Sequence, residues 1–369
     1  MKKVAILLFL AGSFSVSMLP AASGQEPGRQ LPEFPYKDGW LGADDAYSIA
    51  LTPTKSVWLF GDTFVGTSTT KLRSESKVMV RNSIGISRCE VERPCEMEYF
   101  WQKPDAPKPR SFFDSGTDQL WYWPLDGFLQ GKTLYVALLA VRNKPGAEPN
   151  DAFGFEIVGS KLATVKNALE PPSGWKITMH DLTDGRLWPG VSLVPEGKYL
   201  LWYTQVSSGE GKGYMTVMRV PQSKMPNPSG NWESLNGEKH WVRGLAGADA
   251  LHVIDQAISE MSVRYHPSIK KWVALSTGPE FPSGRAVART ADSPVGPWSA
   301  PQTIYEFPEM KRDNPSYDKD TFCYAVKEHI EFTDSKIAMT YTCNSMVLAK
   351  TIANMNIYRP RGVILDLPQ

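Results

Sequence analysis

The sequence predicts an all-β fold, a five-bladed β-propeller, and three observations carry this prediction. Five short strand-like runs recur along the 369 residues, with starts 77, 65, 73 and 65 residues apart. A turn signal and another strand-like run precede each of them, so each is expected to form a hairpin. Helical periodicity is scarce, and only residues 251–258 are expected to form a short helix. A unit of three or four strands repeated five times is what a propeller requires.

The elements follow one order in every unit. The five runs are residues 57–62, 134–139, 199–204, 272–277 and 337–342, and the β-like runs that follow them are 83–87, 155–158, 214–219, 286–289 and 355–358. A Pro/Gly turn ending in Trp recurs at residues 172–175, 228–232 and 294–298, where it is expected between outer strands of successive blades. A large sandwich or two small β domains would not predict units of similar length without a linker. We therefore expect one domain over residues 25–369.

The first 24 residues are typical of a secretory signal peptide. Lys2 and Lys3 precede an apolar run, and small residues lead to Gly24. The alternative is a membrane anchor, but Gly and Ser interrupt the run, which is shorter than the roughly 20 apolar residues that span a bilayer. We expect cleavage near Gly24 and a secreted or periplasmic protein without an integral membrane segment.

Export makes the four cysteines candidates for disulfide bonds. Their spacing fits neither a zinc site nor a redox CxxC motif. Three connectivities are open, and we favour Cys89 with Cys95 across a short loop and Cys323 with Cys343 between neighbouring strands. Both bonds would stabilise the fold without taking part in chemistry.

Composition excludes several classes of function. Hydrophobic residues make up 42% of the chain, enough for a substantial core. The net charge is +1, and it becomes −1 without the leader, which offers no electrostatic footprint for nucleic acid. The sequence contains no GxSxG, HExxH or P-loop motif and no convincing sialidase-type Asp box. A monomer is expected.

Two acids of the first unit are the strongest candidates for chemistry. Pairing Leu51 with Val57 across the turn makes Asp44 and Asp62 diagonal neighbours on one sheet face. In this register Asp45 points away, whereas a slip of one residue would place it opposite Asp62. Two carboxylates at the mouth of a channel can divide into one proton-bearing and one ionised group, as glycoside hydrolysis requires. The alternative is that these acids bind backbone amides at blade edges.

Other units supply further polar and aromatic side chains at equivalent positions. Glu260 is a candidate general acid, since burial in an apolar funnel would raise its pKa. Aromatic rings suit the apolar faces of sugars, although any single Trp is more often interblade core. The candidate substrate-binding residues are Asp126, Trp121, Trp123, Trp188, Arg81, Asn82 and His329.

Several segments resemble a known family. Residues 42–48, 58–64 and 81–84 are similar to the opening of the secreted five-bladed propellers of domain-of-unknown-function family 4185, which includes endo-D-arabinanases. Residues 262–267, 272–275 and 289–298 look like its fourth-blade segments. The resemblance implies Asp44 and Asp62 as the catalytic pair. Asp45 departs from the pattern, because a small residue such as Gly is more usual there, and residues 123–127 look more like related propellers of unassigned activity.

Together these observations predict an exported glycoside hydrolase that cleaves a furanose-containing, arabinan-like or other cell-surface polysaccharide. No cofactor is required, and a central calcium ion is compatible with the fold. One alternative is a non-catalytic propeller that binds glycans or a protein, which predicts acids that are dispersed or paired with Arg and Lys. Another is a lyase or sialidase, which needs a Tyr or Arg cluster at the channel centre.

Overall fold

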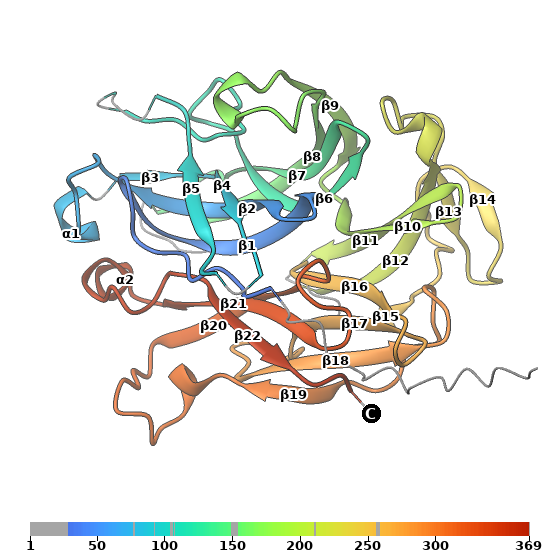
Figure 1. The fold of residues 1–369 in the computed structure, drawn as a ribbon. Helices are drawn as coiled ribbons and strands as arrows, with labels where there is room; N and C mark the ends of the chain where they lie inside the picture. The colour runs from blue at the N-terminus through green and yellow to red at the C-terminus, as the bar shows by residue number, and fades with distance from the viewer. Residues whose placement is uncertain are drawn as a thin grey trace, which may run out of the picture.

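The computed structural model describes residues 29–76, 78–91, 93–103, 106, 108–148, 154–209, 212–255 and 259–368. In these residues five antiparallel sheets are arranged around a common centre, which is the architecture of a five-bladed β-propeller (Figure 1). The expected leader, residues 1–24, lies outside the described part. No helix within that part is long and apolar enough to cross a bilayer.

Each sheet forms one blade from consecutive residues, and its first strand lies nearest the centre. Blade 1 contains β1 (Trp40–Thr52), β2 (Lys55–Val65), β3 (Val78–Val80), β4 (Ser83–Arg88) and β5 (Glu96–Phe100). Blade 2 contains β6 (Trp121–Gln130), β7 (Thr133–Asn143), β8 (Phe155–Val165) and β9 (Ile177–Asp184). Blade 3 contains β10 (Leu187–Glu196), β11 (Tyr199–Gly209), β12 (Lys212–Pro221), β13 (Glu233–Leu235), β14 (Trp241–Arg243) and β15 (Ile254–Asp255).

The last two blades are smaller. Blade 4 contains β16 (Met261–His266), β17 (Lys271–Thr277), β18 (Arg285–Ala291) and β19 (Gln302–Glu306). Blade 5 has three strands, β20 (Thr321–Glu328), β21 (Ile337–Ser345) and β22 (Arg361–Leu365). The α-helices of the described residues are short, α1 (Arg73–Ser76) and α2 (Leu348–Ala353).

The five predicted runs are confirmed, because each lies in the second strand of a blade. These strands read as nearly continuous apolar runs since both of their faces are buried. The recurring Pro/Gly and Trp turn lies between the third and fourth strands of blades 2, 3 and 4.

Two local predictions are wrong. Residues 355–358 form no strand, and the third strand of blade 5 begins at Arg361, after Tyr358 has taken a φ of 56° that interrupts extended backbone. The described part of the expected helix at 251–258 instead contains β15, whose Ile254 pairs with Met215 of β12. Pairing with an open sheet edge outweighs a weak helical preference.

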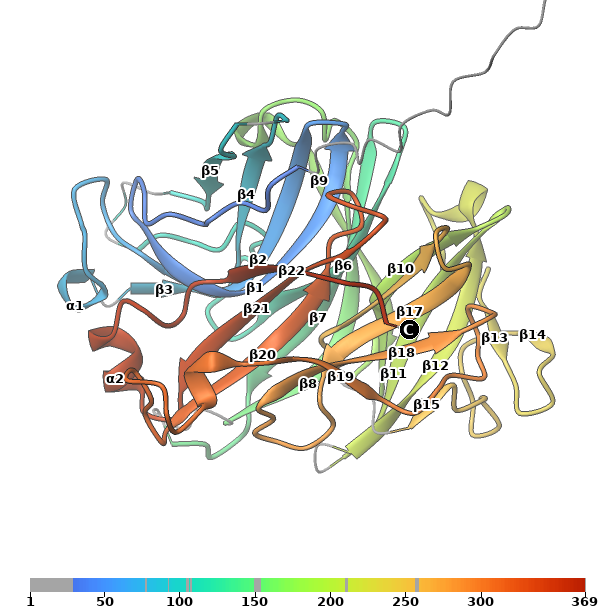
Figure 2. The same cartoon turned by 60° about the horizontal axis from the view of Figure 1, so that its bottom comes forward.

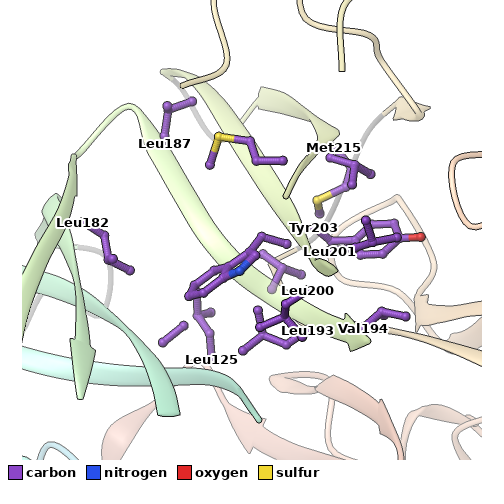
Figure 3. Packing of buried hydrophobic residues seen from close by; sticks show 14 of the residues in the cluster. Leu125, Leu182, Leu187, Leu193, Val194, Leu200, Leu201, Tyr203 and Met215 are labelled. Atoms are coloured by element: carbon purple, nitrogen blue, oxygen red, sulfur yellow. The ribbon is translucent and has the colours of Figure 1, made fainter. Parts of the chain in front are cut away.

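Hydrophobic side chains between the blades form the core. Leu125 of β6, Leu193 of β10 and Tyr203 of β11 belong to one buried cluster that joins blades 2 and 3 (Figure 3). Each large apolar side chain that is buried in this way contributes about 1.5–3 kcal/mol. Because neighbouring blades share these clusters, the position of each blade is set by the next.

The ring closes between blade 5 and blade 1. Strands β20 and β21 pack against β1, so the red and blue elements of Figures 1 and 2 lie side by side. The hydroxyl of Thr340 on β21 donates a hydrogen bond of 3.2 Å to the carbonyl of Ala46 on β1. Closure therefore relies on packing and side-chain hydrogen bonds between two complete blades.

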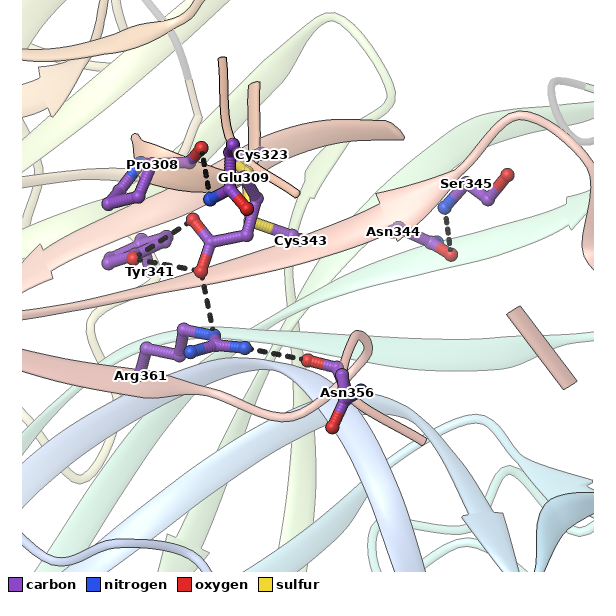
Figure 4. The surroundings of a disulfide bond; sticks show 10 residues. Pro308, Glu309, Cys323, Tyr341, Cys343, Asn344, Ser345, Asn356 and Arg361 are labelled. Carbon is purple, nitrogen blue, oxygen red and sulfur yellow. Dashed lines mark hydrogen bonds and ion pairs between the residues drawn. A yellow bond between two sulfur atoms is a disulfide. The ribbon is translucent and has the colours of Figure 1, made fainter. Parts of the chain in front are cut away.

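Both expected cysteine pairings are confirmed. Cys323 and Cys343 are directly opposed on β20 and β21 and form a disulfide (Figure 4). Cys89 and Cys95 close the short loop between β4 and β5. Beside the first bond, Glu309 accepts hydrogen bonds from the Tyr341 hydroxyl and pairs with Arg361 at 3.0 Å (Figure 4).

Candidate functional site

Acids from two blades converge at the ends where the innermost strands begin. Asp44 and Asp45 lie near the start of β1, and Glu260 directly precedes β16. The β1–β2 register differs from the expected one, because Ile49 and not Leu51 faces Val57. The paired strands continue to Thr52 and Lys55, so two residues lie between them, and the pairing shifts once between Ala50 and Thr52.

A bulge in β1 brings both of its acids inward. The pairing shifts on each side of Asp45, where φ is 63°, so Asp45 does not point away as expected. A Cβ atom on Gly61 would lie 2.5 Å from Asp44 Oδ1 and 2.7 Å from Asp45 Oδ2. The two carboxyl groups thus meet over the bare backbone of Gly61.

Two tyrosines hold Asp44. The hydroxyls of Tyr324 and Tyr358 donate to its Oδ2 at 2.9 and 3.3 Å, whereas its buried Oδ1 has no hydrogen-bond partner among the described residues. Burial raises the pKa of Asp44 well above its usual value, and the negative charges of Asp45 and Asp62 add to this. Asp44 is therefore suited to carry a proton.

Asp45 faces the acid of blade 4. It accepts a hydrogen bond of 2.7 Å from the Tyr47 hydroxyl. Burial raises the pKa of Asp45 to about 8, with a further contribution from the charge of Glu260. Blades 1 and 4 are not neighbours in the ring, so this coupling acts across the central opening.

Asp62 on β2 lies in a different environment. Its Oδ2 pairs with the Arg81 guanidinium at 2.9 Å, and its Oδ1 accepts a hydrogen bond of 2.9 Å from Trp123 Nε1. The side chain is 16% exposed. Both oxygens accept from donors, as an ionised carboxylate does.

Glu260 is a third acid at this site. The backbone N–H of Ala325 donates to its Oε2 at 2.8 Å. Burial raises the pKa of Glu260 to about 7, and the charge of Asp44 contributes. A carboxyl group with this pKa holds a proton near neutral pH and can release it, which is what general acid catalysis needs.

Two positively charged side chains, Lys327 and Arg264, extend across the ring and contact residues of other blades. The ammonium of Lys327, from blade 5, donates to the carbonyl of Val191 on blade 3 at 2.7 Å and lies 4.2 Å from the centre of the Tyr47 ring. Burial lowers the pKa of Lys327 to about 8. Arg264, from blade 4, contacts Asp126 of blade 2 at 3.2 Å.

The structure does not place Asp126 where substrate would reach it. Asp126 is fully buried, and its oxygens accept from the backbone N–H groups of Gly127 and Leu193. Burial acts to raise the pKa of Asp126, but the charges of Lys327 and Arg264 outweigh it and hold the pKa low. Asp126 is a buried anion that ties blades together.

Four other expected substrate-binding residues lie away from the acids or beneath them. Asn82 and His329 are fully buried; Asn82 bonds the backbone around Phe113, and both ring nitrogens of His329 are occupied, by Ser48 and Thr340. Trp121 is buried under the Arg81 guanidinium, and Trp188 donates to the carbonyl of Gly185. Of the expected substrate-binding residues, Trp123 and Arg81 contact an acid of the site directly.

Residues that sequence reasoning missed complete the site. Tyr324, Tyr358 and Lys327 all come from the fifth unit; Tyr324 follows Asp44 by 280 residues and Tyr358 by 314. No local motif announces them. The one available signal was the apolar run that holds Lys327, where a charged residue interrupts a buried strand.

The described residues offer no thiolate metal site. Their one group of three potential ligands close enough to hold a metal is Glu309, Cys323 and Cys343, and those sulfurs are bonded to each other. Calcium takes six to eight oxygen ligands. Where the Lys327 ammonium crosses the ring, it supplies the positive charge itself and leaves no need for a calcium ion. A calcium ion elsewhere on the axis, which the fold would allow, is not tested by these residues.

Comparisons with known proteins agree with this fold. Residues 34–365 match the profile of a protein family described as Domain of unknown function (DUF5005). No curated protein matches the sequence. A provisionally named hydrolase from Bacteroides ovatus is similar in structure, with 17% identity and a TM-score of 0.67 over 90% of this chain and 87% of that chain.

Glycoside hydrolases are more distant structural matches. A xylan β-1,4-xylosidase from Bacillus halodurans has 11% identity and a TM-score of 0.46 over 86% of this chain and 51% of that chain. A GH43_1 enzyme from Xanthomonas citri has 11% identity and a TM-score of 0.44 over 88% and 87% of the two chains. At these identities, likeness to solved structures shows the fold alone.

Proposed function

The chain belongs to the DUF5005 family, whose description assigns no function, and we propose that it is a glycoside hydrolase. One observation carries this proposal: at one mouth of the ring, proton-bearing acids face a carboxylate whose two oxygens are held by donors. Glu260 has a pKa of about 7, while Asp62 is bound by Arg81 and Trp123. Hydrolysis of a glycosidic bond uses such a pair.

In the proposed reaction Glu260 donates its proton to the oxygen of the leaving sugar as the bond from that oxygen to the anomeric carbon breaks. In one route, Asp62 accepts a proton from the water that attacks the anomeric carbon. In the other, Asp62 bonds to the anomeric carbon, and a water that gives its proton to Glu260 then breaks this bond; the configuration of the product distinguishes the two routes. Asp44 acts beside them, since its raised pKa lets it carry a proton and its Oδ1, which has no partner among the described residues, is available to a substrate hydroxyl.

The pKa values of the tyrosines around Asp44 give no support to a lyase or a sialidase that relies on a tyrosine of lowered pKa. A tyrosine that acts as nucleophile or base is activated by a lowered pKa or by an adjacent base. Burial raises the pKa of Tyr324 and of Tyr358 well above the usual value, and the charge of Asp44 adds to this. These hydroxyls serve as hydrogen-bond donors to the carboxylate.

The substrate we propose is a furanose-containing, arabinan-like polysaccharide outside the cell. The motif resemblance of the first and fourth units supports the sugar class. The disulfides Cys89–Cys95 and Cys323–Cys343 support an oxidising compartment, together with the signal-like leader. Membership of family 4185 itself remains an interpretation of those motifs.

The test is product release from arabinans, arabinogalactan and other plant and bacterial polysaccharides by the purified mature protein. We expect oligosaccharides from the wild type and a loss of about a hundredfold or more in Asp44→Asn, Asp62→Asn and Glu260→Gln. Asp292→Asn, at a surface position that is 85% exposed, is the matched control. The pH–activity profile of the wild type should fall near pH 7, where Glu260 gives up its proton. The profile of Glu260→Gln should not show this fall.

The rival is a propeller that binds glycans without cleaving them. The ion pair between Arg81 and Asp62 favours it, because paired acids are what that alternative predicts. Binding of a polysaccharide by the wild type with no release of product from any polymer would establish the rival and end the hydrolase proposal.

A further inference from the structure

A row of aromatic rings leads outward from Asp44. Tyr324, which donates to Asp44, stacks on Phe322 two residues earlier on β20, with ring centres 5.2 Å apart. Phe322 in turn packs edge-on against Phe281 at 5.5 Å. Phe281 belongs to the loop between β17 and β18 of the neighbouring blade. We call Tyr324, Phe322 and Phe281 the aromatic row.

Exposure increases along the aromatic row. Tyr324 and Phe322 are partly exposed, and Phe281 is 62% exposed, the highest value among the exposed large hydrophobic residues of the described chain. An exposed phenylalanine taken alone needs no explanation. Here it is the outer end of a continuous contact path to an acid of the site.

The loop that carries Phe281 is held in place. The Arg285 guanidinium pairs with Glu280 at 2.9 Å, and the Ser283 hydroxyl donates to the same carboxylate at 3.3 Å. The backbone of Gly278 donates to the Arg285 carbonyl at 3.0 Å. Phe281 is thus presented on an ordered support, so a ligand that stacks on it would not have to order the loop first.

A second aromatic group flanks the acids from blade 2. Trp123 donates to Asp62 and packs edge-on against Phe155 at 4.6 Å. The acids therefore lie between two aromatic surfaces, one from blade 2 and one from blades 4 and 5. This is an arrangement for a ligand that extends beyond a single sugar ring.

We propose that the aromatic row is a binding surface for successive sugar units of an oligosaccharide or polysaccharide whose cleaved bond lies at Asp44, Asp62 and Glu260. The inference rests on the proposed hydrolase function and specifies where the sugar units beyond the cleaved bond lie. Sugar rings have an apolar face that packs on aromatic rings, while their hydroxyls stay in water. The surface selects for chain length, because a short ligand that fills the acid site does not reach Phe281.

The test compares Phe281→Ala with Phe281→Trp and with a control, Tyr265→Ala. Tyr265 is also an exposed aromatic, 42% exposed, but lies at the end of β16 remote from Glu260. Affinity electrophoresis against arabinan, arabinogalactan, xylan and β-1,3-galactan identifies the polysaccharide that the wild type binds most tightly. Fragments of graded length from that polymer then serve for titration calorimetry in the Asp44→Asn background and for kcat/KM in the active protein.

We expect wild-type affinity to rise with fragment length and Phe281→Ala to weaken binding of long fragments about tenfold, the order expected from losing one aromatic contact. Binding of the shortest fragments should not change. Phe281→Trp should restore the rise, and Tyr265→Ala should behave as the wild type.

The outcomes separate the two proposals. Cleavage with an unchanged dependence on length in Phe281→Ala would overturn the aromatic row and leave the hydrolase intact. Absence of cleavage combined with a selective loss of long-fragment binding would retain the aromatic row on a glycan-binding protein. If the wild type neither binds nor cleaves any of the polymers, both proposals fail.

Discussion

Asp45 shows how one residue departs from the pattern around it. Its φ of 63° and the φ of 97° at Ala46 lie in the left-handed region, which disfavours residues with a Cβ and tolerates Asp better than most. The motif resemblance places a small residue such as Gly at this position. With Asp there, the same bend of β1 delivers a second carboxyl group to Gly61.

The raised pKa of Asp45 predicts a stabilising substitution. Folding raises this pKa from about 3.8 to about 8, so the folded state holds the proton more tightly and the stability contributed by Asp45 falls as pH rises through this window. Asp45→Asn should therefore gain stability relative to the wild type between pH 4 and pH 8, by at least about 1 kcal/mol at the upper end.

Urea unfolding from pH 4 to pH 9 measures this difference. Asp292→Asn, on the exposed surface, should show no such trend. A difference between Asp45→Asn and the wild type that does not vary with pH would contradict the assignment of a proton to Asp45.

At the scale of the element, the pair of strands β1 and β2 makes the site, and Gly61 is its least replaceable position. A Cβ there would overlap the oxygens of Asp44 and Asp45. Gly61→Ala should displace both carboxyl groups and lower kcat/KM about a hundredfold, because displacement of reacting groups by about 1 Å has effects of that order. The circular dichroism spectrum should stay that of the wild type.

Gly131→Ala is the matched control for Gly61→Ala. Gly131 lies in the turn between β6 and β7, where a methyl group would project into open space, but its φ is 61°, so its substitution strains the backbone without touching the acids. A loss of activity in Gly131→Ala as large as that in Gly61→Ala would show that general destabilisation, and not the position of the acids, is responsible.

Blade 5 has three strands, fewer than any other blade, and a disulfide joins two of these strands. The bond from Cys323 to Cys343 closes a loop with a sequence separation of 20, whereas the bond from Cys89 to Cys95 has a separation of 6. Loop-closure entropy makes the first worth about 3 kcal/mol and the second about 2 kcal/mol. Replacing both Cys323 and Cys343 by Ser should lower the melting temperature more than replacing both Cys89 and Cys95 by Ser. Scanning calorimetry measures this difference. The reverse order would contradict a special role of the disulfide in blade 5.

At the scale of the whole molecule, charged side chains connect blades that are not neighbours. Lys327 links blade 5 to blade 3, and Arg264 links blade 4 to blade 2. The positive charges of Lys327 and Arg264 keep the pKa of Asp126 low. The charge of Lys327 also opposes the rise in the pKa of Asp45 and of Glu260 that burial causes. One set of residues thus both braces the ring and adjusts the acids.

Lys327→Met tests this double role. Removing the buried charge of Lys327 leaves the negative charges around it without a partner, which lowers the free energy of unfolding by about 3–5 kcal/mol. Without the ammonium, the pKa of Glu260 should rise above about 7, so the limb of the pH–activity profile near neutrality should move to higher pH. Lys271→Met, which removes a surface ion pair with Asp292, should change neither quantity. Lost stability with an unmoved pH profile would leave Lys327 a purely structural role.

The fold, the favoured pairing of the four cysteines and the first-unit acids could be predicted from the sequence alone. Strands buried on both faces must be apolar, so the five second strands appear as runs, and Cys323 and Cys343 fall on strands that such a unit pairs. Asp44 and Asp62 flank one hairpin, and a pairing argument reaches them even with the wrong register.

Glu260 was also a candidate from the repeat, but the groups that hold the acids follow from the arrangement of the blades in space. Tyr324 and Lys327 come from the fifth blade, and no local pattern relates them to β1. Ring closure sets those distances, as the bulge at Asp45 sets the direction of its carboxyl group. Packing between blades buries Asp126, Asn82 and His329, because a polar residue becomes part of the core wherever a neighbouring element covers it and satisfies its hydrogen bonds.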